Sequence, residues 1–443
     1  MKPILTSLLI IIVTVTSFSQ SLINSIDDYI STYALTGDFS GSVLIIQNNT
    51  TLFNKSYGFS DYERKTPNSF ETRYMIGSIS KQFTAAAILL LEEDGKLNIT
   101  ESLSLYFPDN PNVKSVKIVD LLTHQSGVRD IYDIPGLMDN QEIKIQAVVD
   151  KLLDMPLYFD PGTRYQYSNG GYAILALLIE QISGQSYEQF LTKRIFAPLK
   201  MQDTSHGSTL EGSNAKGYDP KGYNGVELAV IRNLELFKGS GSLSSTTSDI
   251  QKWIVALNIG NLLSPESTEK FFKNYGNSYG LGISVYKMFD KEVFGHDGRI
   301  TGFIGDYLHY IKDDLSIIIL GNIQTGIVDF LRRDIAAIIF EKDYETKAKS
   351  GNPIQLNEKQ INTLKGTYEF GPNFNVYLKI INGLPMVKAN EGSYSELIPL
   401  QDGRFFNRTL YAYIKFNNDE SDNVSEMLWI NNDGNTFPGK KVN

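Results

Sequence analysis

Two regions of strand-like sequence enclose a long helical region, and this order constrains the fold of the chain most strongly. Near the start, "GSVLIIQNNTTLFNKSYGFSD" reads as two strands around an Asn-Asn turn, which predicts a β-hairpin. Helical periodicity prevails from residue 114 to about residue 282, and strand-like segments such as "FIGDYLHYI" and "LSIIILGN" follow it, closed by a helix over 327–340. We therefore expect an α+β domain: an antiparallel sheet shared by the two ends, flanked by helices, with an all-helical lobe.

A second, smaller domain is predicted at the C-terminal end. Residues 341–360 are polar and lose periodicity, which is typical of a linker. Residues 361–443 contain short strand-like segments at turn-like spacing, which predict an all-β domain, either a small sandwich or a barrel. This segment has no cluster of nucleophile, base or metal ligands, so we interpret it as a packing or binding appendage.

The N-terminal segment has the pattern of an export signal. Lys2 supplies a positive charge, Pro3 to Val15 is almost continuously apolar, and Ser17 and Ser19 are small residues at the positions that a signal peptidase reads. We predict a signal peptide over residues 1–19, with a retained membrane anchor as the alternative, and a main domain over 21–340. The mature protein is then expected in a bacterial periplasm or secreted space, without stable membrane insertion.

Composition excludes several classes of function. The chain has no cysteine, which rules out a thiol nucleophile, disulfides and thiolate metal sites. Its four histidines form no ligand-spaced pair, and a net charge of −9 argues against nucleic-acid binding. We expect no metal and no cofactor, and a small molecule or peptide as the partner; the sequence does not specify an oligomeric state.

Ser78 and Lys81 form the first chemically suggestive pair. Residues three apart share a face of a helix, so a desolvated Lys81 can accept the Ser78 proton. The alternative is a helix-capping serine beside a surface lysine. The segment that follows, "QFTAAAILLL", is apolar on nearly all sides, which predicts a buried helix and favours the reactive interpretation.

Two further segments carry polar groups next to glycine. Tyr167 and Asn169 precede a Gly-Gly step into an apolar helix, where a tyrosine can carry protons and an amide can position a lysine or a carbonyl. His296 and Gly298 lie at a strand end, where a glycine allows close backbone approach. Taken singly, each segment has an ordinary structural interpretation: a surface tyrosine with a helix cap, and a strand histidine in a hairpin.

In this order, the three pairs resemble the three motifs of the serine β-lactamase and penicillin-binding-protein superfamily. The Tyr-x-Asn motif is similar to the class C β-lactamase and DD-peptidase branch, and the His-x-Gly motif to certain DD-carboxypeptidases, D-aminopeptidases and family VIII esterases. The segments "LLTHQSGV" (121–128) and "GSGSLSSTTSDIQKW" (239–253) also resemble the family. The resemblance covers roughly residues 22–340, and the tail resembles the lipocalin-like modules appended to such hydrolases.

The resemblance implies a catalytic role for five residues and a substrate-binding or oxyanion role for two. Ser78 would form an acyl-enzyme with the help of Lys81, Tyr167 would move protons, and Asn169 would position Lys81 and the substrate. His296 occupies the third motif, and Gly298 and Arg299 adjoin it, with the N–H groups of Ser78 and Arg299 as the oxyanion hole. His124 and Ser126 are expected to support the site structurally.

The third motif has a histidine where a lysine would bind a substrate carboxylate. A histidine is charged only part of the time near neutral pH, although Arg299 would restore a positive charge nearby. The expected substrates are therefore D-amino-acid peptides and small esters first, and β-lactams second. The alternative function is a non-catalytic ligand-binding or sensor protein on the same fold.

Overall fold

The computed structural model describes residues 20–207, 214–230, 233–372, 374–390, 392–431 and 434–442. The chain divides into two compact units. The Ser78 unit comprises Gly41–Tyr218 and Leu228–Gln324, and the tail unit comprises the residues up to Ser40, Asp219–Glu227 and Thr325–Asn443. The signal peptide predicted over 1–19 lies outside the described residues, and the predicted domain boundaries at 340 and 361 stay predictions.

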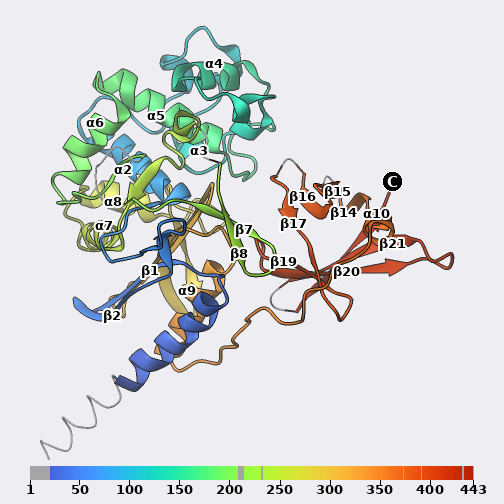
Figure 1. Cartoon of the computed structure of the whole chain (residues 1–443). Helices are drawn as coiled ribbons and strands as arrows, with labels where there is room; N and C mark the ends of the chain where they lie inside the picture. Colours follow the sequence, from blue (N-terminus) through green and yellow to red (C-terminus); the bar gives the residue numbers. More distant parts are fainter. Residues whose placement is uncertain are drawn as a thin grey trace, which may run out of the picture. The chain divides into compact units, whose positions relative to one another are not determined.

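A six-stranded antiparallel sheet forms the centre of the Ser78 unit (Figure 1). Its strands, in spatial order, are β10 (Ser284–Met288), β11 (Lys291–Ile300), β12 (Phe303–Tyr310), β13 (Leu315–Gly321), β1 (Gly41–Gln47) and β2 (Thr50–Tyr57). The register of β1 on β13 pairs Gly41 with Gly321. The N-terminal hairpin and the later strands thus share one sheet, which confirms the predicted α+β arrangement.

Helices of the Ser78 unit cover this sheet and form the predicted helical lobe (Figure 1). They are α2 (Ser80–Glu93), α3 (Ile118–Leu122), α4 (Ile145–Asp154), α5 (Asn169–Ser183), α6 (Tyr187–Leu191), α7 (Thr247–Ile259) and α8 (Pro265–Phe272). The short helical turns are η1 (Gly77–Ile79), η2 (Leu103–Leu105), η3 (Pro111–Val113), η4 (Ile131–Asp133), η5 (Leu137–Asp139), η6 (Thr192–Phe196) and η7 (Leu234–Phe237). Residues 80–91 of α2 are buried, so this helix is a core element, as its apolar sequence predicts.

Two small sheets complete the strands of the Ser78 unit described here, and one of them adjoins η1. One pairs β3 (Phe59–Asp61) with β4 (Thr66–Pro67). The other has the order β5 (Tyr74–Met75), β9 (Leu243–Ser245), β6 (Ser205–His206). Because β5 ends two residues before Gly77, its pairing with β9 fixes the start of η1 from one side.

The tail unit contains a nine-stranded antiparallel sheet. Its spatial order is β17 (Ser395–Glu396), β16 (Leu384–Ala389), β15 (Phe374–Ile381), β14 (Gly366–Gly371), β22 (Thr436–Lys441), β21 (Val424–Ile430), β20 (Ala412–Asn418), β19 (Phe405–Asn407) and β18 (Ile398–Pro399). The outermost strands, β17 and β18, are separated in sequence by Leu397 alone, so the two edges of the sheet must lie close together. The sheet therefore curves into a nearly closed barrel around an apolar core that includes Tyr368, Val376 and Ile414.

The tail unit also includes segments from earlier in the chain. Residues 20–35 are helical, and α9 (Val328–Ile339) pairs with them through the Tyr29 hydroxyl, which donates a hydrogen bond of 2.5 Å to Asp334. The hairpin of β7 (Tyr218–Lys221) and β8 (Gly225–Leu228) has its tip in this unit. A short helix, α10 (Glu358–Thr363), begins within the segment predicted as a linker.

In the part of the chain that the structure describes, no helix is long and apolar enough to cross a membrane.

Candidate active site

Ser78 lies in a tight 3-10 turn, η1, directly before α2, rather than inside the α-helix that the sequence predicts. The turn begins at Gly77, whose φ of 51° favours glycine. Ser78 is half-buried while its neighbours Gly77 and Ile79 are buried. The hydroxyl is therefore presented at a rigid, partly accessible position.

Lys81 is fully buried beside Ser78, and its amine has three polar neighbours. Its Nζ lies 3.1 Å from Ser78 Oγ, 2.9 Å from Asn169 Oδ1 and 2.7 Å from the carbonyl oxygen of Ser240. Burial lowers the pKa of Lys81 to about 7, although the charges of Asp130 and Asp297 oppose this shift. A substantial fraction of the amine is therefore neutral near physiological pH.

A charged Lys81 donates to all three neighbours, and the same arrangement suits the neutral amine. Asn169 Oδ1 and the Ser240 carbonyl can only accept hydrogen bonds, and the two hydrogens of a neutral amine serve both of them. The lone pair of the nitrogen then remains for the third neighbour, the hydroxyl hydrogen of Ser78. Lys81 is thus placed as a base toward Ser78.

Tyr167 approaches the same oxygen from the other side. Its hydroxyl donates a hydrogen bond of 2.8 Å to Ser78 Oγ, and Lys81 Nζ lies 4.7 Å from the centre of its ring. Burial raises the pKa of Tyr167 well above its usual value, so the hydroxyl keeps its proton. The resting site therefore contains a protonated tyrosine next to a serine and a lysine.

Asn169 is the first residue of α5 and is oriented by Asp130. The Asp130 carboxylate accepts from the Asn169 backbone N–H (2.6 Å) and from its side-chain Nδ2 (3.2 Å). This bond turns the amide oxygen toward Lys81. Ser168 caps the helix by accepting from the N–H of Gly171, so the position of Asn169 is fixed by both cap and carboxylate.

His296 lies in β11 with both ring nitrogens close to polar groups of the protein. Its Nε2 is 2.9 Å from the Tyr279 hydroxyl, and its Nδ1 is 2.5 Å from the carbonyl oxygen of Asp297. The same Tyr279 hydroxyl lies 3.3 Å from Nε2 of His124. His296 is thus joined to a buried hydrogen-bond network, which limits its freedom to bind a substrate carboxylate.

His124 links that network to Tyr167. Its Nδ1 accepts a hydrogen bond from the Ser168 N–H (3.1 Å), and its ring stacks on the Tyr167 ring at 4.1 Å between centres. Burial lowers the pKa of His124 well below its usual range, so the ring is neutral. The backbone φ of His124 is 58°, which is uncommon for a histidine. A constrained, neutral ring at this position fits the supporting role expected for His124.

Gly298 and Arg299 bring the third motif against the turn of Ser78. A Cβ on Gly298 would lie 2.0 Å from the carbonyl oxygen of Ile76 and 3.1 Å from the nitrogen of Ser78. A Cβ on Gly77 would lie 2.6 Å from the backbone nitrogen of Arg299. Two backbone segments, 76–78 and 298–299, therefore lie side by side, as the two N–H donors of an oxyanion hole require.

Three contributors to this site were not predicted as such. Asp130 lies two residues after the "LLTHQSGV" segment, and a lone carboxylate there gives no signal without the position of Asn169. Ser240 contributes only its backbone carbonyl, which no side-chain pattern reveals. Tyr279 stands among many tyrosines of the chain, and its role depends on contacts far apart in sequence.

An apolar pocket of about 300 Å³ lies next to the turn that carries Ser78. Met75, Phe237 and Ile300 are among its lining residues. A Cβ on Gly241 would lie within 3.7 Å of both Phe237 and Gly77, which places the pocket wall beside the turn. Among the described residues, no group of three or more acidic or histidine side chains could hold a metal ion.

Comparison with known proteins agrees with this geometry. The family model described as Beta-lactamase matches residues 27–340. Penicillin-binding protein 4* of Bacillus subtilis (strain 168) is 28% identical over 433 residues, covering 88% of this chain and 93% of the relative. Teichoic acid D-alanine hydrolase of Staphylococcus aureus is 29% identical over 296 residues, covering 66% of this chain and 72% of the relative.

A solved structure shares the fold along nearly the whole chain. The octameric penicillin-binding protein homologue from Pyrococcus abyssi aligns with a TM-score of 0.65 at 21% identity, covering 94% of this chain and 100% of that chain. Because the alignment extends beyond residue 340, the likeness includes the tail.

Proposed function

We propose that this chain, which belongs to the β-lactamase family of serine hydrolases, is exported and cleaves amide or ester bonds through an acyl-enzyme at Ser78. The observation that carries the proposal is the buried amine of Lys81, whose three neighbours leave its lone pair for the Ser78 hydroxyl. Export to a periplasm or secreted space rests on the N-terminal signal pattern.

In the acylation step, Ser78 Oγ attacks the substrate carbonyl carbon while its proton passes to Lys81 Nζ. Negative charge develops on the carbonyl oxygen, and the N–H groups of Ser78 and Arg299 would stabilise it. The Tyr167 hydroxyl then gives its proton to the leaving oxygen or nitrogen as the bond to the carbonyl carbon breaks. The protonated Lys81 returns a proton to the tyrosine.

Deacylation runs the same steps with water. Water attacks the acyl carbon and loses a proton toward Tyr167 and Lys81, and Ser78 leaves with a proton restored to its oxygen. Asn169 keeps the lysine in place throughout, and Asp130 keeps Asn169 oriented. A cofactor is not required for this chemistry.

We propose D-amino-acid peptides and small esters, D-alanyl esters among them, as the first substrate class and β-lactams as the second, with no need for a carboxylate on the substrate. Support comes from the hydrogen bonds that occupy both nitrogens of His296, since they leave this residue poorly placed to hold a carboxylate. The name of the Staphylococcus relative, a D-alanine hydrolase, points to the same class.

The test is intact-mass analysis after incubation with a panel of D-alanyl esters, D-amino-acid amides, short-chain esters and a penicillin. We expect a mass increase equal to the acyl group, located on the peptide that contains Ser78 and absent in Ser78→Ala. A thermal shift with ligands but no adduct and no product on any panel member would instead favour a binding or sensor protein.

A further inference from the structure

The β7–β8 hairpin starts and ends at the apolar pocket beside Ser78. Residues 214–217 precede it, Leu228 is its last residue and Ala229 follows it, and all of them line the pocket. The tip of the hairpin, residues 219–227, belongs to the tail unit. The chain itself thus connects a wall of the pocket with the tail unit.

The two legs of the hairpin are held differently. At the base of the outgoing leg, the Tyr218 N–H donates to the carbonyl oxygens of Gly302 (3.1 Å) and Asn322 (3.0 Å). The return leg pairs with β7, and the Ala229 N–H donates to the carbonyl oxygen of Gly217 (3.0 Å). Leu228, on the return leg, is 49% exposed, so packing contributes little to its position. Ala229 is buried and packs beside Gly302, so the Ser78 unit itself holds it. The position of Leu228, in contrast, depends on the hairpin that leads to it.

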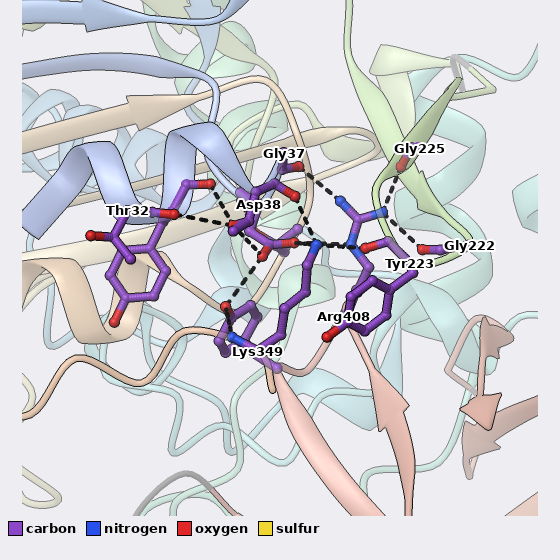
Figure 2. Close-up of polar contacts among 12 residues, drawn as sticks. Thr32, Gly37, Asp38, Gly222, Tyr223, Gly225, Lys349 and Arg408 are labelled. Carbon is purple, nitrogen blue, oxygen red and sulfur yellow. Dashed lines mark hydrogen bonds and ion pairs between the residues drawn. The ribbon is translucent and has the colours of Figure 1, made fainter. Parts of the chain in front are cut away.

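The tip of the hairpin is held by two buried cations of the tail (Figure 2). Arg408 Nη1 donates to the carbonyl oxygens of Gly222 (3.0 Å) and Gly225 (2.5 Å). Lys349 Nζ donates to the carbonyl oxygen of Tyr223 (2.5 Å). Three carbonyl groups of the turn are thus fixed from the tail.

One buried carboxylate, Asp38, orients both cations. Lys349 Nζ and Arg408 Nε each lie 3.0 Å from Asp38 Oδ1, and the exposed fractions of the Lys349, Arg408 and Asp38 side chains are 2%, 1% and 0%. A single carboxylate needs only one cation for neutrality, and a second buried cation is unfavourable unless hydrogen bonds compensate it. The tip carbonyls provide three of these bonds, beside those of Thr36 (2.7 Å) and Gly37 (2.8 Å). We therefore interpret the Asp38 cluster (Asp38, Lys349 and Arg408) as a device for holding the hairpin.

We propose that the tail sets the substrate preference of the Ser78 site: the Asp38 cluster fixes the β7–β8 hairpin, and the hairpin places Leu228, beside the buried Ala229, as a wall that binds an apolar acyl or side-chain group of the substrate. The inference rests on the hydrolase function proposed above. Among the described residues that line the pocket, Lys216 is the one basic residue, and it is paired with Asp61 (3.1 Å) and Glu63 (3.0 Å), which leaves an apolar group as the suitable occupant.

The experiment compares Arg408→Gln and Lys349→Met with the wild type in the full chain. Each substitution leaves Asp38 one cation and makes the cluster neutral, so the fold is expected to survive. The matched control is Tyr368→Phe, which removes another buried hydrogen bond of the tail, from the Tyr368 hydroxyl to the carbonyl oxygen of Leu364 (2.6 Å). Turnover is measured with p-nitrophenyl acetate and p-nitrophenyl octanoate, and hydrogen exchange is measured over residues 225–230.

We expect both cluster variants to lose at least fivefold in kcat/KM for the octanoate, through KM, and less than twofold for the acetate. Amide exchange over 225–230 should be faster in both, and the control should match the wild type in both measurements. Unchanged exchange and an unchanged octanoate-to-acetate ratio in folded variants would overturn the inference. If the wild type hydrolyses neither ester and forms no adduct with any member of the panel above, the proposed function fails, and the exchange data alone still decide whether the tail holds the hairpin.

Discussion

The protonation state of Lys81 controls the chemistry at the scale of single residues. Burial lowers its pKa to about 7, and only the neutral amine can accept the Ser78 proton. We therefore predict that kcat/KM for a neutral ester rises about tenfold per pH unit up to about pH 7 and levels off above it. A pH–rate profile measures this, and Lys81→Arg, which stays charged, should lose at least about a thousandfold at every pH.

The same profile in Asp130→Asn provides the control. The Asp130 charge raises the pKa of Lys81, so its removal should lower that pKa and move the acid limb to lower pH. A smaller plateau is also expected, because Asn169 loses the carboxylate that orients it. An acid limb that stays in place, or moves to higher pH, would show that a group other than Lys81 titrates.

At this scale the sequence predicts side chains better than it predicts their environment. A helical turn brings Ser78 and Lys81 together, but the reactive interpretation also needs the buried helix and the two later motifs. The Ser240 carbonyl that accepts a hydrogen bond from Lys81 comes from residues far along the chain. Likewise, the hydrogen bonds that occupy His296 depend on Tyr279, whose position follows from the tertiary fold.

At the scale of elements, the site depends on strand β11 packing against the turn η1. We predict that Gly298→Ala lowers kcat/KM at least a hundredfold, because its Cβ would lie 2.0 Å from the carbonyl oxygen of Ile76 and must displace the Ser78 turn. Overpacking of this kind also lowers the free energy of unfolding by about 1–3 kcal/mol. Ester kinetics and urea denaturation measure the two effects.

Gly371→Ala is the control for Gly298→Ala. It also replaces a strand glycine by alanine, but at a position without steric crowding. A Cβ on Gly371, in β14, would have no other atom within 4 Å, and this residue does not need a positive φ. Gly371→Ala should therefore keep wild-type activity and stability. If Gly298→Ala is equally active, the close approach of β11 to η1 is not needed for catalysis.

Element types were mostly predictable, and their ends were not. The β1–β2 hairpin, the strands β10 to β13 and helix α5 lie where periodicity places them, since each has a strong apolar pattern. The α-helix predicted around Ser78 begins later, at Ser80, because Gly77 and the neighbouring strand backbone impose a tighter turn. Such a local constraint comes from packing and has no periodic signal.

At the scale of the whole chain, the polar composition of 341–360 predicted a linker, and α10 begins inside it. Lys349 lies in this segment, yet it is buried against Asp38, more than three hundred residues earlier in the chain. Composition averages over such a segment, so one buried lysine within a polar stretch does not stand out. The partner of Asp38 could be identified only from the fold.

The Asp38 cluster also predicts how the tail unit unfolds. Asp38→Asn leaves Lys349 and Arg408 buried without a carboxylate, and breaking a buried ion pair from one side costs about 3–5 kcal/mol. We expect calorimetry to show a transition at lower temperature in this variant. Adding Arg408→Gln removes one of the two unpaired cations, so the double variant should recover part of the loss, whereas independent roles would make the two losses add. Full additivity would therefore contradict a cluster in which one carboxylate orients both cations.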